Sequence, residues 1–349
     1  METENRYRQK ARFLFISLIL SLMLFGVVPL RAQETVYPRY GEGITLLLKR
    51  FDRSGAAYER EFIRLNKGKL GKNNSLRRGI RYTLPPKKLS TATAQREPEV
   101  SGQGRKNHQP LFGKKLASYT VNSSELRGAC FYLVSGHGGP DPGAIGRMNG
   151  HTLHEDEYAY DIMLRLARNL LSRGAKVHII IQDARDGIRN QLYLNNSKRE
   201  TCMGSPIPLN QVKRLEQRCV MINALNRKDK ERYKRAIFIH VDSRSKHKRT
   251  DVFFYHQPKS QAGKRLAKTM KSTFAHKYDK HQPGRGFSGT VDDRDLYVLR
   301  NAAPPSLFVE LGNIQNRYDQ QRIILANNRQ ALANWLCEGF IADYKRSKR

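Results

Sequence analysis

Three short apolar runs, far apart in the chain, each lead into a side chain that can bind a metal ion or exchange a proton. Residues 131–134 lead into His137, residues 236–239 into His240, and residues 307–309 into Glu310. Bounded apolar runs of this length are typical of strands that are buried on both faces of a sheet. Because functional groups in open α/β sheets gather beyond the carboxyl ends of the strands, we expect these side chains to converge.

The segment from about residue 116 to the C-terminus alternates apolar runs with helical patterns. This alternation predicts an α/β fold, with a mostly parallel twisted sheet and helices on both faces. We expect strands at 130–134, 176–181, 236–240, 252–256, 296–299 and 306–310, and helices at 155–172, 210–226, 260–278 and 319–344. Residues 184–208 are too irregular for either and predict a long loop beside the site.

The N-terminus predicts export. Several basic residues between positions 6 and 12 precede an uninterrupted apolar stretch at 13–28, and Ala32 follows shortly afterwards. This is the pattern of a secretory signal, and the stretch is shorter than the about 20 residues of a membrane span. We expect residues 1–32 to be a signal peptide cleaved near Ala32, which places the protein in the periplasm or cell envelope; a retained anchor is the alternative.

Residues 33–86 predict a small basic α+β module, with an amphipathic helix around Leu47 and a strand around Tyr82. The segment resembles a lysin-motif (LysM) glycan-binding module in residues 41–44, 65–66 and 76–79. A basic spacer with no ligand is the alternative. Residues 87–115 are polar and have little to bury, so they predict a flexible linker to a second domain at 116–349.

Charge narrows the choice of partners. Lys and Arg number 64 against 31 Asp and Glu, a formal net charge of +33. Such a surface attracts polyanions, which include nucleic acid, anionic lipid headgroups and acidic wall polymers. The predicted export and the lack of an aromatic-rich basic motif argue against nucleic acid, so we expect an anionic cell-wall or membrane surface.

The cysteines do not predict a zinc knot, because Cys130, Cys202, Cys219 and Cys337 include no Cys-x-x-Cys pair. Disulfides are permitted in an exported chain, and Cys202 with Cys219 is the pair to test. Cys130 and Cys337 lie in apolar contexts and fit small core residues equally well.

The polar residues at the strand ends suit a catalytic metal. Zinc in such sites takes three protein ligands and keeps a fourth position open. His137, Glu155 and His240 meet that count, and Glu155 lies in the first turn of an expected helix, where the helix dipole favours an ionised carboxylate. Asp156 and Glu157 fit the same description, so spacing alone leaves this ligand open.

The string Gly136-His137-Gly138-Gly139-Pro140-Asp141-Pro142-Gly143-Ala144-Ile145-Gly146, followed by Glu155, residues 238–242 and residues 309–313, resembles the zinc-dependent N-acetylmuramoyl-L-alanine amidases of the Amidase_3 type. The resemblance covers about residues 116–344. It implies one zinc ion held by His137, Glu155 and His240, with Glu310 as the catalytic carboxylate. The implied reaction is hydrolysis of the amide bond between N-acetylmuramic acid and L-alanine in peptidoglycan. Counting back from Arg173-Gly174 at the helix end selects Glu155 over Glu157.

Several positions depart from the family pattern, namely Val134-Ser135, Phe238, Leu311 and Asn313. None of them is an implied ligand or the catalytic carboxylate. They surround the site and therefore bear on substrate fit and rate. A catalytically weak protein that keeps the amidase fold and binds or scaffolds the cell wall is the alternative function.

Overall fold

The computed structural model describes residues 34–38, 42–53, 55–71, 74–77, 79–87, 105–246 and 248–348. The chain divides into two compact units, Met1–Glu99 and Val100–Arg349. The predicted signal peptide at 1–32 lies outside the described residues. Within the described part, no helix combines the length and the apolar character that a membrane span needs.

The first unit has the element order β1 (Thr35–Val36), α2 (Ile44–Arg50), α3 (Ala56–Leu65) and β2 (Tyr82–Thr83), and β1 pairs antiparallel with β2. Leu47, Phe62 and Tyr82 form its buried core with neighbouring apolar residues. Asn66 joins helix to strand, because its side chain donates to the carbonyls of Phe62 and Thr83 and accepts from the Thr83 amide. The unit is a small α+β module, as expected, while its LysM character stays a prediction.

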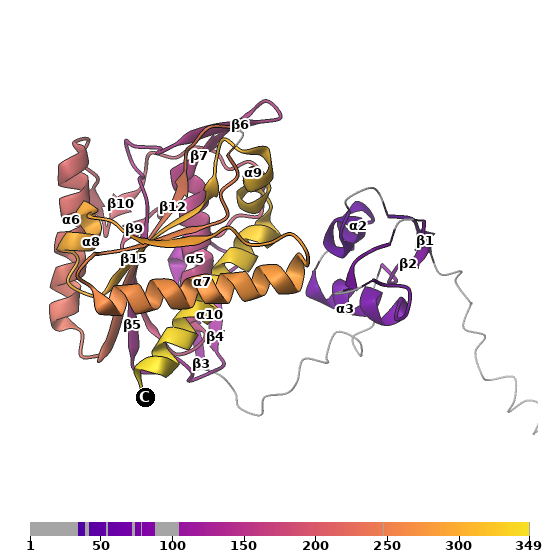
Figure 1. Ribbon diagram of the computed structural model, residues 1–349, viewed down its shortest axis with the longest axis horizontal. Coiled ribbons are helices and arrows are strands. Elements are labelled where there is room, and N and C mark those ends of the chain that lie inside the picture. The colour runs from indigo at the N-terminus through magenta and orange to yellow at the C-terminus, as the bar shows by residue number, and fades with distance from the viewer. Residues whose placement is uncertain are drawn as a thin grey trace, which may run out of the picture. The chain divides into compact units, whose positions relative to one another are not determined.

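The second unit is built on a six-stranded sheet with the order β14-β13-β15-β12-β5-β8 (Figure 1). Its strands are β5 (Ala129–Ser135), β8 (Lys176–Ile179), β12 (Tyr233–Asp242), β13 (Phe253–His256), β14 (Thr290–Asp293) and β15 (Ser306–Asn313). Every neighbouring pair is parallel except β13 with β15. The predicted mostly parallel sheet is confirmed.

Helices cover both faces of this sheet. On one face α5 (Glu155–Leu171), α7 (Gln261–His281) and α10 (Ala326–Ser347) pack against the strands and one another; α6 (Gln211–Lys228) and α8 (Tyr297–Asn301) pack together on the other (Figure 1). Side chains alternate along β5, so Phe131 and Leu133 enter the first core while Tyr132 and Val134 enter the second. This two-sided burial explains why the strands read as continuous apolar runs.

Short elements connect this framework. They are β3 (Arg105–His108), the 3-10 helix η2 (Pro110–Phe112), β4 (Ser118–Val121), β6 (Ile145–Met148), β7 (His151–His154), β9 (Ile181–Gln182), β10 (Thr201–Cys202), β11 (Ser205–Pro206) and α9 (Arg317–Ile324). The hairpin of β6 and β7 brings the chain from the end of β5 to the start of α5. Residues 184–208, predicted to be a loop, are mostly irregular but include the β10–β11 hairpin, which extends β9.

Residues 105–115 of the predicted linker at 87–115 contain a strand and a 3-10 helix, so this part of the segment is not the flexible linker that was expected. Strand β3 pairs antiparallel with β4, and η2 buries Phe112 in the main core. Leu111 packs against the same core. The polar composition concealed these contacts, the first of which is made by β3.

The strand predicted at 296–299 is wrong, because these residues enter helix α8. A short apolar run does not distinguish a strand from a buried helical turn. Val298 packs into the core beneath α6 from this helix. The polar edge strand β14, which was not predicted, lies just before it.

The helix predicted at 319–344 is in fact two helices, α9 and α10, separated at Leu325. The fully buried Arg329 stabilises this break, because its Nη1 donates to the carbonyls of Ile323 and Ile324 at 2.7 Å each. These carbonyls at the end of α9 would otherwise be buried without partners.

All four cysteines are buried free thiols, so the Cys202–Cys219 disulfide that was considered is not formed. Cys130, Cys202 and Cys219 belong to the core on the α6 side of the sheet. Cys337 belongs to the core on the other side.

Candidate functional site

The structure brings together the four side chains that the sequence singled out. His137 follows β5, Glu155 opens α5, and His240 and Glu310 are register partners on the adjacent strands β12 and β15. One ligand atom from each of His137, Glu155 and His240 lies within 4.8 Å of the other two. Asp156 and Glu157 point into a separate group with Glu200, so the geometry favours Glu155 among the three acidic neighbours.

Two glycines make room for this cluster. A Cβ atom at Gly136 would lie 2.3 Å from Cε1 of His240, and one at Gly143 would lie 2.7 Å from Oε2 of Glu155. His137 itself has a φ of +60°, between Gly136 and a Gly138 that also has a positive φ. The glycine-rich string thus turns the chain sharply and lets the backbone approach the ligand atoms closely.

Glu155 lies between the two imidazoles. Its Oε1 is 2.9 Å from Nδ1 of His240 and accepts from the Val241 amide at 3.0 Å. Its Oε2 is 3.3 Å from Nε2 of His137 and accepts from the Ala144 amide at 2.8 Å. Burial alone would raise the pKa of Glu155, but hydrogen bonds to both imidazoles hold that pKa well below its usual range. The carboxylate therefore stays ionised.

Asp141 fixes the orientation of His137. Its Oδ2 lies 2.8 Å from Nδ1 of His137 and accepts from Nη2 of Arg214 at 2.7 Å, while its Oδ1 accepts from the Gly143 amide at 3.1 Å. Burial would lower the pKa of His137, but its hydrogen bonds to Asp141 and Glu155 raise the pKa to about 10. With Nδ1 engaged by Asp141, Nε2 is left for the cluster, as in many metal sites.

Sequence reasoning gave Asp141 and Arg214 no role. Asp141 had a signal, because it lies in the glycine-rich string four residues after His137. Arg214 had none, since it comes from α6 and reaches the site only through the fold. Arg218, one turn further along α6, donates to the His137 carbonyl.

Phe308 sets the plane of the second imidazole. Its ring stacks on that of His240, with centroids 4.2 Å apart and planes 18° apart. His137 meets His240 edge to face at 5.0 Å. Burial lowers the pKa of His240, which favours the neutral imidazole that can donate a lone pair.

Glu310 differs from its neighbours because its Oε2 atom is buried and accepts no hydrogen bond from the described residues. Burial raises the pKa of Glu310 well above its usual range, and the charges of Glu155 and Asp242 raise it further. A carboxyl group left without a partner next to potential metal ligands is typical of residues that exchange protons.

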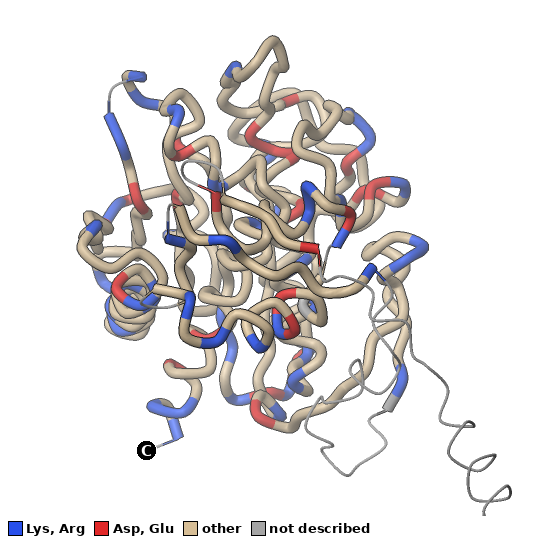
Figure 2. The backbone as a smooth tube through the Cα atoms, turned by 90° about the vertical axis from the view of Figure 1, so that its right-hand side faces the viewer, with Lys and Arg blue, Asp and Glu red and all other residues tan. Residues whose placement is uncertain are grey.

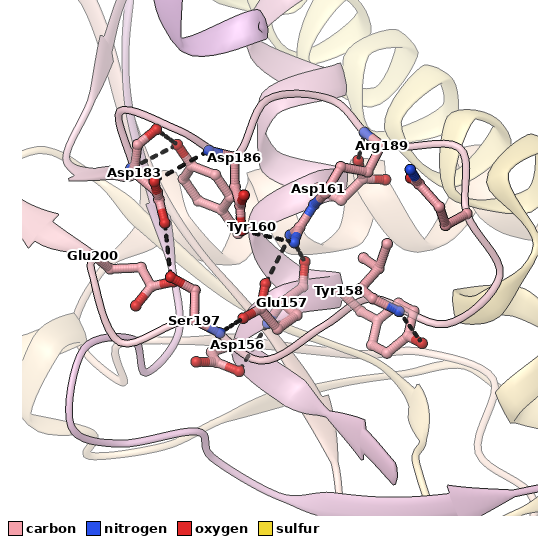
Figure 3. Close-up of polar contacts among 12 residues, drawn as sticks. Asp156, Glu157, Tyr158, Tyr160, Asp161, Asp183, Asp186, Arg189, Ser197 and Glu200 are labelled. Carbon is pink, nitrogen blue, oxygen red and sulfur yellow. Dashed lines mark hydrogen bonds and ion pairs between the residues drawn. The ribbon is translucent and has the colours of Figure 1, made fainter. Parts of the chain in front are cut away.

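A second group of carboxylates, Asp156, Glu157 and Glu200, lies at the start of α5 and in the irregular segment after β9 (Figure 3). Glu200 accepts from the Gly139 amide at 2.8 Å, and Glu157 accepts from the Ser197 amide and pairs with Arg189 at 2.8 Å. Burial and the neighbouring charges of Glu157 and Glu200 raise the pKa of Asp156 to about 9, so one of the three carries a proton at neutral pH. This group joins the irregular segment after β9 to α5 and to the loop that bears His137.

The donor set of two imidazoles and one carboxylate fits a zinc ion. The space that Gly136 and Gly143 keep clear lies against the same atoms. The side chain of His137 is 26% exposed, so water and substrate can reach the cluster. The residues present therefore fit the catalytic metal that the sequence implied.

Comparison with known proteins bears on this fit. Residues 132–342 match the Amidase_3 family model, which is described as N-acetylmuramoyl-L-alanine amidase. The chain belongs to this amidase family. The matched segment contains His137, Glu155, His240 and Glu310, whose individual roles stay predictions.

The amidase chain is also similar to solved structures. Cwp6 from Clostridium difficile is 20% identical with a TM-score of 0.45, over 61% of this chain and 29% of its own. An N-acetylmuramoyl-L-alanine amidase from Clostridium difficile 630 is 20% identical with a TM-score of 0.45, over 63% of this chain and 98% of its own. The amidase AmiC2 of Nostoc punctiforme is 21% identical with a TM-score of 0.45, over 64% and 99%. The comparison with curated proteins gave no match.

Proposed function

We propose that this amidase hydrolyses the bond between N-acetylmuramic acid and L-alanine in peptidoglycan, and that it depends on zinc. The observation that carries the proposal is the convergence of His137, Glu155 and His240 beside Glu310, whose Oε2 has no hydrogen-bond partner in the part of the chain that the structure describes. Membership of the amidase family supplies the bond and the substrate class.

His137, Glu155 and His240 are the residues that would hold the metal. A zinc ion held there would supply Lewis acidity toward water and the scissile carbonyl, and its positive charge would offset the charges of Glu155 and Asp242 that add to the effect of burial on the pKa of Glu310. Glu310 then accepts the proton of the attacking water and passes it to the departing amine of L-alanine. Asp141 keeps Nδ1 of His137 engaged throughout, so that the imidazole does not turn away from the site.

The rest of the chain supports attachment to the wall. Figure 2 shows Lys and Arg at many positions along the chain among the less numerous Asp and Glu, and this excess of positive charge suits an anionic polymer or membrane surface. We propose that residues 1–32 direct export to the periplasm or cell envelope and that residues 33–86 bind glycan in the manner of a LysM module. Nucleic acid is not a proposed partner, and no regulator is proposed.

The test is mass spectrometry of purified peptidoglycan after incubation with the chain lacking residues 1–32, with and without zinc. We expect zinc-dependent release of stem peptides that begin with L-alanine. Glu310→Gln should lower the rate by about 10² to 10⁴, the usual contribution of general acid–base catalysis. Glu216→Gln, an exposed glutamate on α6, is the matched control and should keep full activity.

Absence of release by folded, zinc-loaded protein would contradict the proposal. If that protein still sediments with the wall, the result would establish the alternative function, a scaffold that keeps the amidase fold. Release that survives Glu310→Gln would instead remove only the assigned role of Glu310.

A further inference from the structure

A further group of potential metal ligands, distinct from the two groups described above, lies toward the ends of β5 and β12 that are remote from His137 and His240. Cys130 is near the start of β5, His178 is on the neighbouring strand β8, and Asp229 follows the end of α6. One ligand atom from each lies within 4.8 Å of the other two. The group shares no residue with the catalytic cluster, which lies beyond the carboxyl end of β5.

One oxygen atom in this group is crowded by donors. Oδ2 of Asp229 lies 2.6 Å from the Tyr132 hydroxyl, 3.0 Å from Nε2 of His178 and 3.4 Å from Sγ of Cys130. A carboxylate oxygen offers about two lone-pair sites, so it cannot satisfy three donors well at once. Tyr132 makes the shortest of the three contacts, and the imidazole and the thiol make the longer ones.

Charged side chains of both signs surround Asp229. Nζ of Lys176 is 2.6 Å from Oδ1 of Asp229 and 3.6 Å from Oε2 of Glu231, so one ammonium faces two carboxylates. Oε2 of Glu231 is buried and accepts no hydrogen bond from the described residues. Burial would raise the pKa of Asp229, but hydrogen bonds from Lys176 and Tyr132 lower it to about 2, so the carboxylate is ionised. Nζ of Lys234 also donates to the Asp229 carbonyl at 2.8 Å, so the two carboxylates of this partly buried site are accompanied by two ammonium groups.

We propose that Cys130, His178 and Asp229 bind a second transition-metal ion of the zinc class, separate from the catalytic one. Sulfur, nitrogen and oxygen donors together suit a borderline-soft cation, whereas Mg²⁺ and Ca²⁺ prefer oxygen alone. The ion replaces the thiol proton of Cys130, which passes to solvent, and takes up the lone pair of His178 that a hydrogen bond would otherwise occupy.

The neighbours of the site suit this role. Tyr132 keeps its hydrogen bond to Asp229 and stacks on His178, with ring centroids 5.3 Å apart and planes 10° apart, so it orients two of the three ligands. The side chain of His178 is 17% exposed, which leaves a route for the ion and a position for water. An ion bound here joins β5, β8 and the end of α6, and its role is structural.

The test is titration of the full metal-free chain with Co²⁺, followed by absorption spectroscopy. Cobalt bound to a thiolate gives a strong near-ultraviolet charge-transfer band, and the catalytic cluster contains no sulfur. We expect this band in the wild type and its loss in Cys130→Ser. The band should remain in Cys337→Ser, a matched control because Cys337 is also a buried free thiol. Metal analysis of the zinc-loaded protein should show two ions per chain for the wild type and one for Cys130→Ser.

His178→Gln serves as a second variant if Cys130→Ser does not fold, and we expect it to lose the band at cobalt concentrations that saturate the wild type. Glu155→Gln should keep the band while it disturbs the catalytic cluster, so the failure of one site is distinguishable from the failure of the other. The proposal is overturned if saturating cobalt gives no thiolate band in the wild type, or if the band persists in Cys130→Ser or His178→Gln.

Discussion

Asp161 in α5 and Glu310 in β15 carry two carboxyl groups inside the same unit, and the hydrogen bonding of the two groups is opposite. Asp161 is fully buried and accepts from Nε of Arg165 at 2.8 Å, Nε of Arg329 at 2.5 Å and the Arg189 amide at 2.7 Å. Oε2 of Glu310 is also buried but accepts no hydrogen bond from the described residues.

The difference separates a structural charge, that of Asp161, from the carboxyl group for which we propose a catalytic role, that of Glu310. Asp161 holds together α5, the irregular segment at Arg189 and the junction of α9 with α10, because each of its partners comes from a different segment. Oε2 of Glu310 accepts no hydrogen bond from any other described residue, which fits the proton exchange proposed for this carboxyl group. In the sequence, Asp161 and Glu310 are both acidic residues near apolar ones. Only the number of hydrogen-bond partners in the folded protein distinguishes the two carboxyl groups.

The largest expected effect is on stability, from Asp161→Ala. The substitution leaves Arg329 buried without its counter-charge, and breaking a buried ion pair in this way costs about 3–5 kcal/mol. The measurement is the free energy of unfolding in urea. Asp295→Ala, which removes an exposed partner of Arg300, should change it by less than about 1 kcal/mol. Equal effects of the two variants would show that burial of the pair is unimportant.

Asp251 provides a second fully partnered carboxylate, and its contribution should depend on pH. Burial would raise its pKa, but hydrogen bonds from Arg285 and Ser288 and the charge of Arg322 lower it below the usual range. Asp251→Asn should therefore cost about 1.5–3 kcal/mol at neutral pH. Because the folded-state pKa is depressed, this stabilisation is present above about pH 4 and is lost as the pH falls through the folded-state value.

The measurement for Asp251 is urea unfolding of the wild type and Asp251→Asn at pH 7 and at about pH 3. The difference between the two proteins should shrink at the lower pH. A difference that grows there would contradict the assigned direction of the pKa shift.

The substitution Asp141→Asn tests whether the residues around the site orient the proposed metal ligands. Asp141→Asn weakens the orientation of His137 and should lower the affinity for zinc by about 10- to 100-fold, the usual effect of losing such a partner. Competition with a chelator measures this affinity. Asp293→Asn, on the exposed part of edge strand β14, is the control and should leave zinc affinity unchanged. An unaltered affinity in Asp141→Asn would show that Arg218 and the loop glycines suffice to orient His137.

The smallest expected effect on stability is that of Glu310→Gln, the variant that should lose activity. Since Oε2 of Glu310 has no hydrogen-bond partner among the described residues, replacing the carboxyl group by an amide of the same shape should change the free energy of unfolding of the metal-free protein by less than about 1 kcal/mol, or increase it. Thermal or urea unfolding beside Asp161→Ala gives the comparison directly. A loss as large as that of Asp161→Ala would place Glu310 among the structural charges.

The sequence predicted the central sheet because its strands are buried on both faces, which leaves the apolar runs that end near His137, His240 and Glu310 easy to find. It failed at residues 296–299, where Val298 packs equally well from a helix, and at Leu325, where the break between α9 and α10 depends on Arg329. Such outcomes are set by contacts across the fold, which local periodicity does not contain.

The candidate site, like the fold, could be predicted from the sequence only in part. The strand ends and the glycine-rich string marked His137, His240 and Glu310, and spacing left Glu155 among three neighbours until the fold showed which of them faces the imidazoles. Arg214 and Phe308 could not be found in advance, because an arginine on a helix and a phenylalanine in a strand are ordinary there. Their importance comes from Asp141 and His240, which only the folded chain brings to them.

The order of the strands also has a consequence for how the chain is made. β15 is the last strand of the sheet in the sequence, yet it lies between β12 and β13 in space. During synthesis the sheet therefore remains split until β15 enters, and pairings of such distant segments form slowly. Glu310 arrives on that strand, so an incomplete chain that already holds both imidazoles still lacks the carboxyl group that we propose to be catalytic.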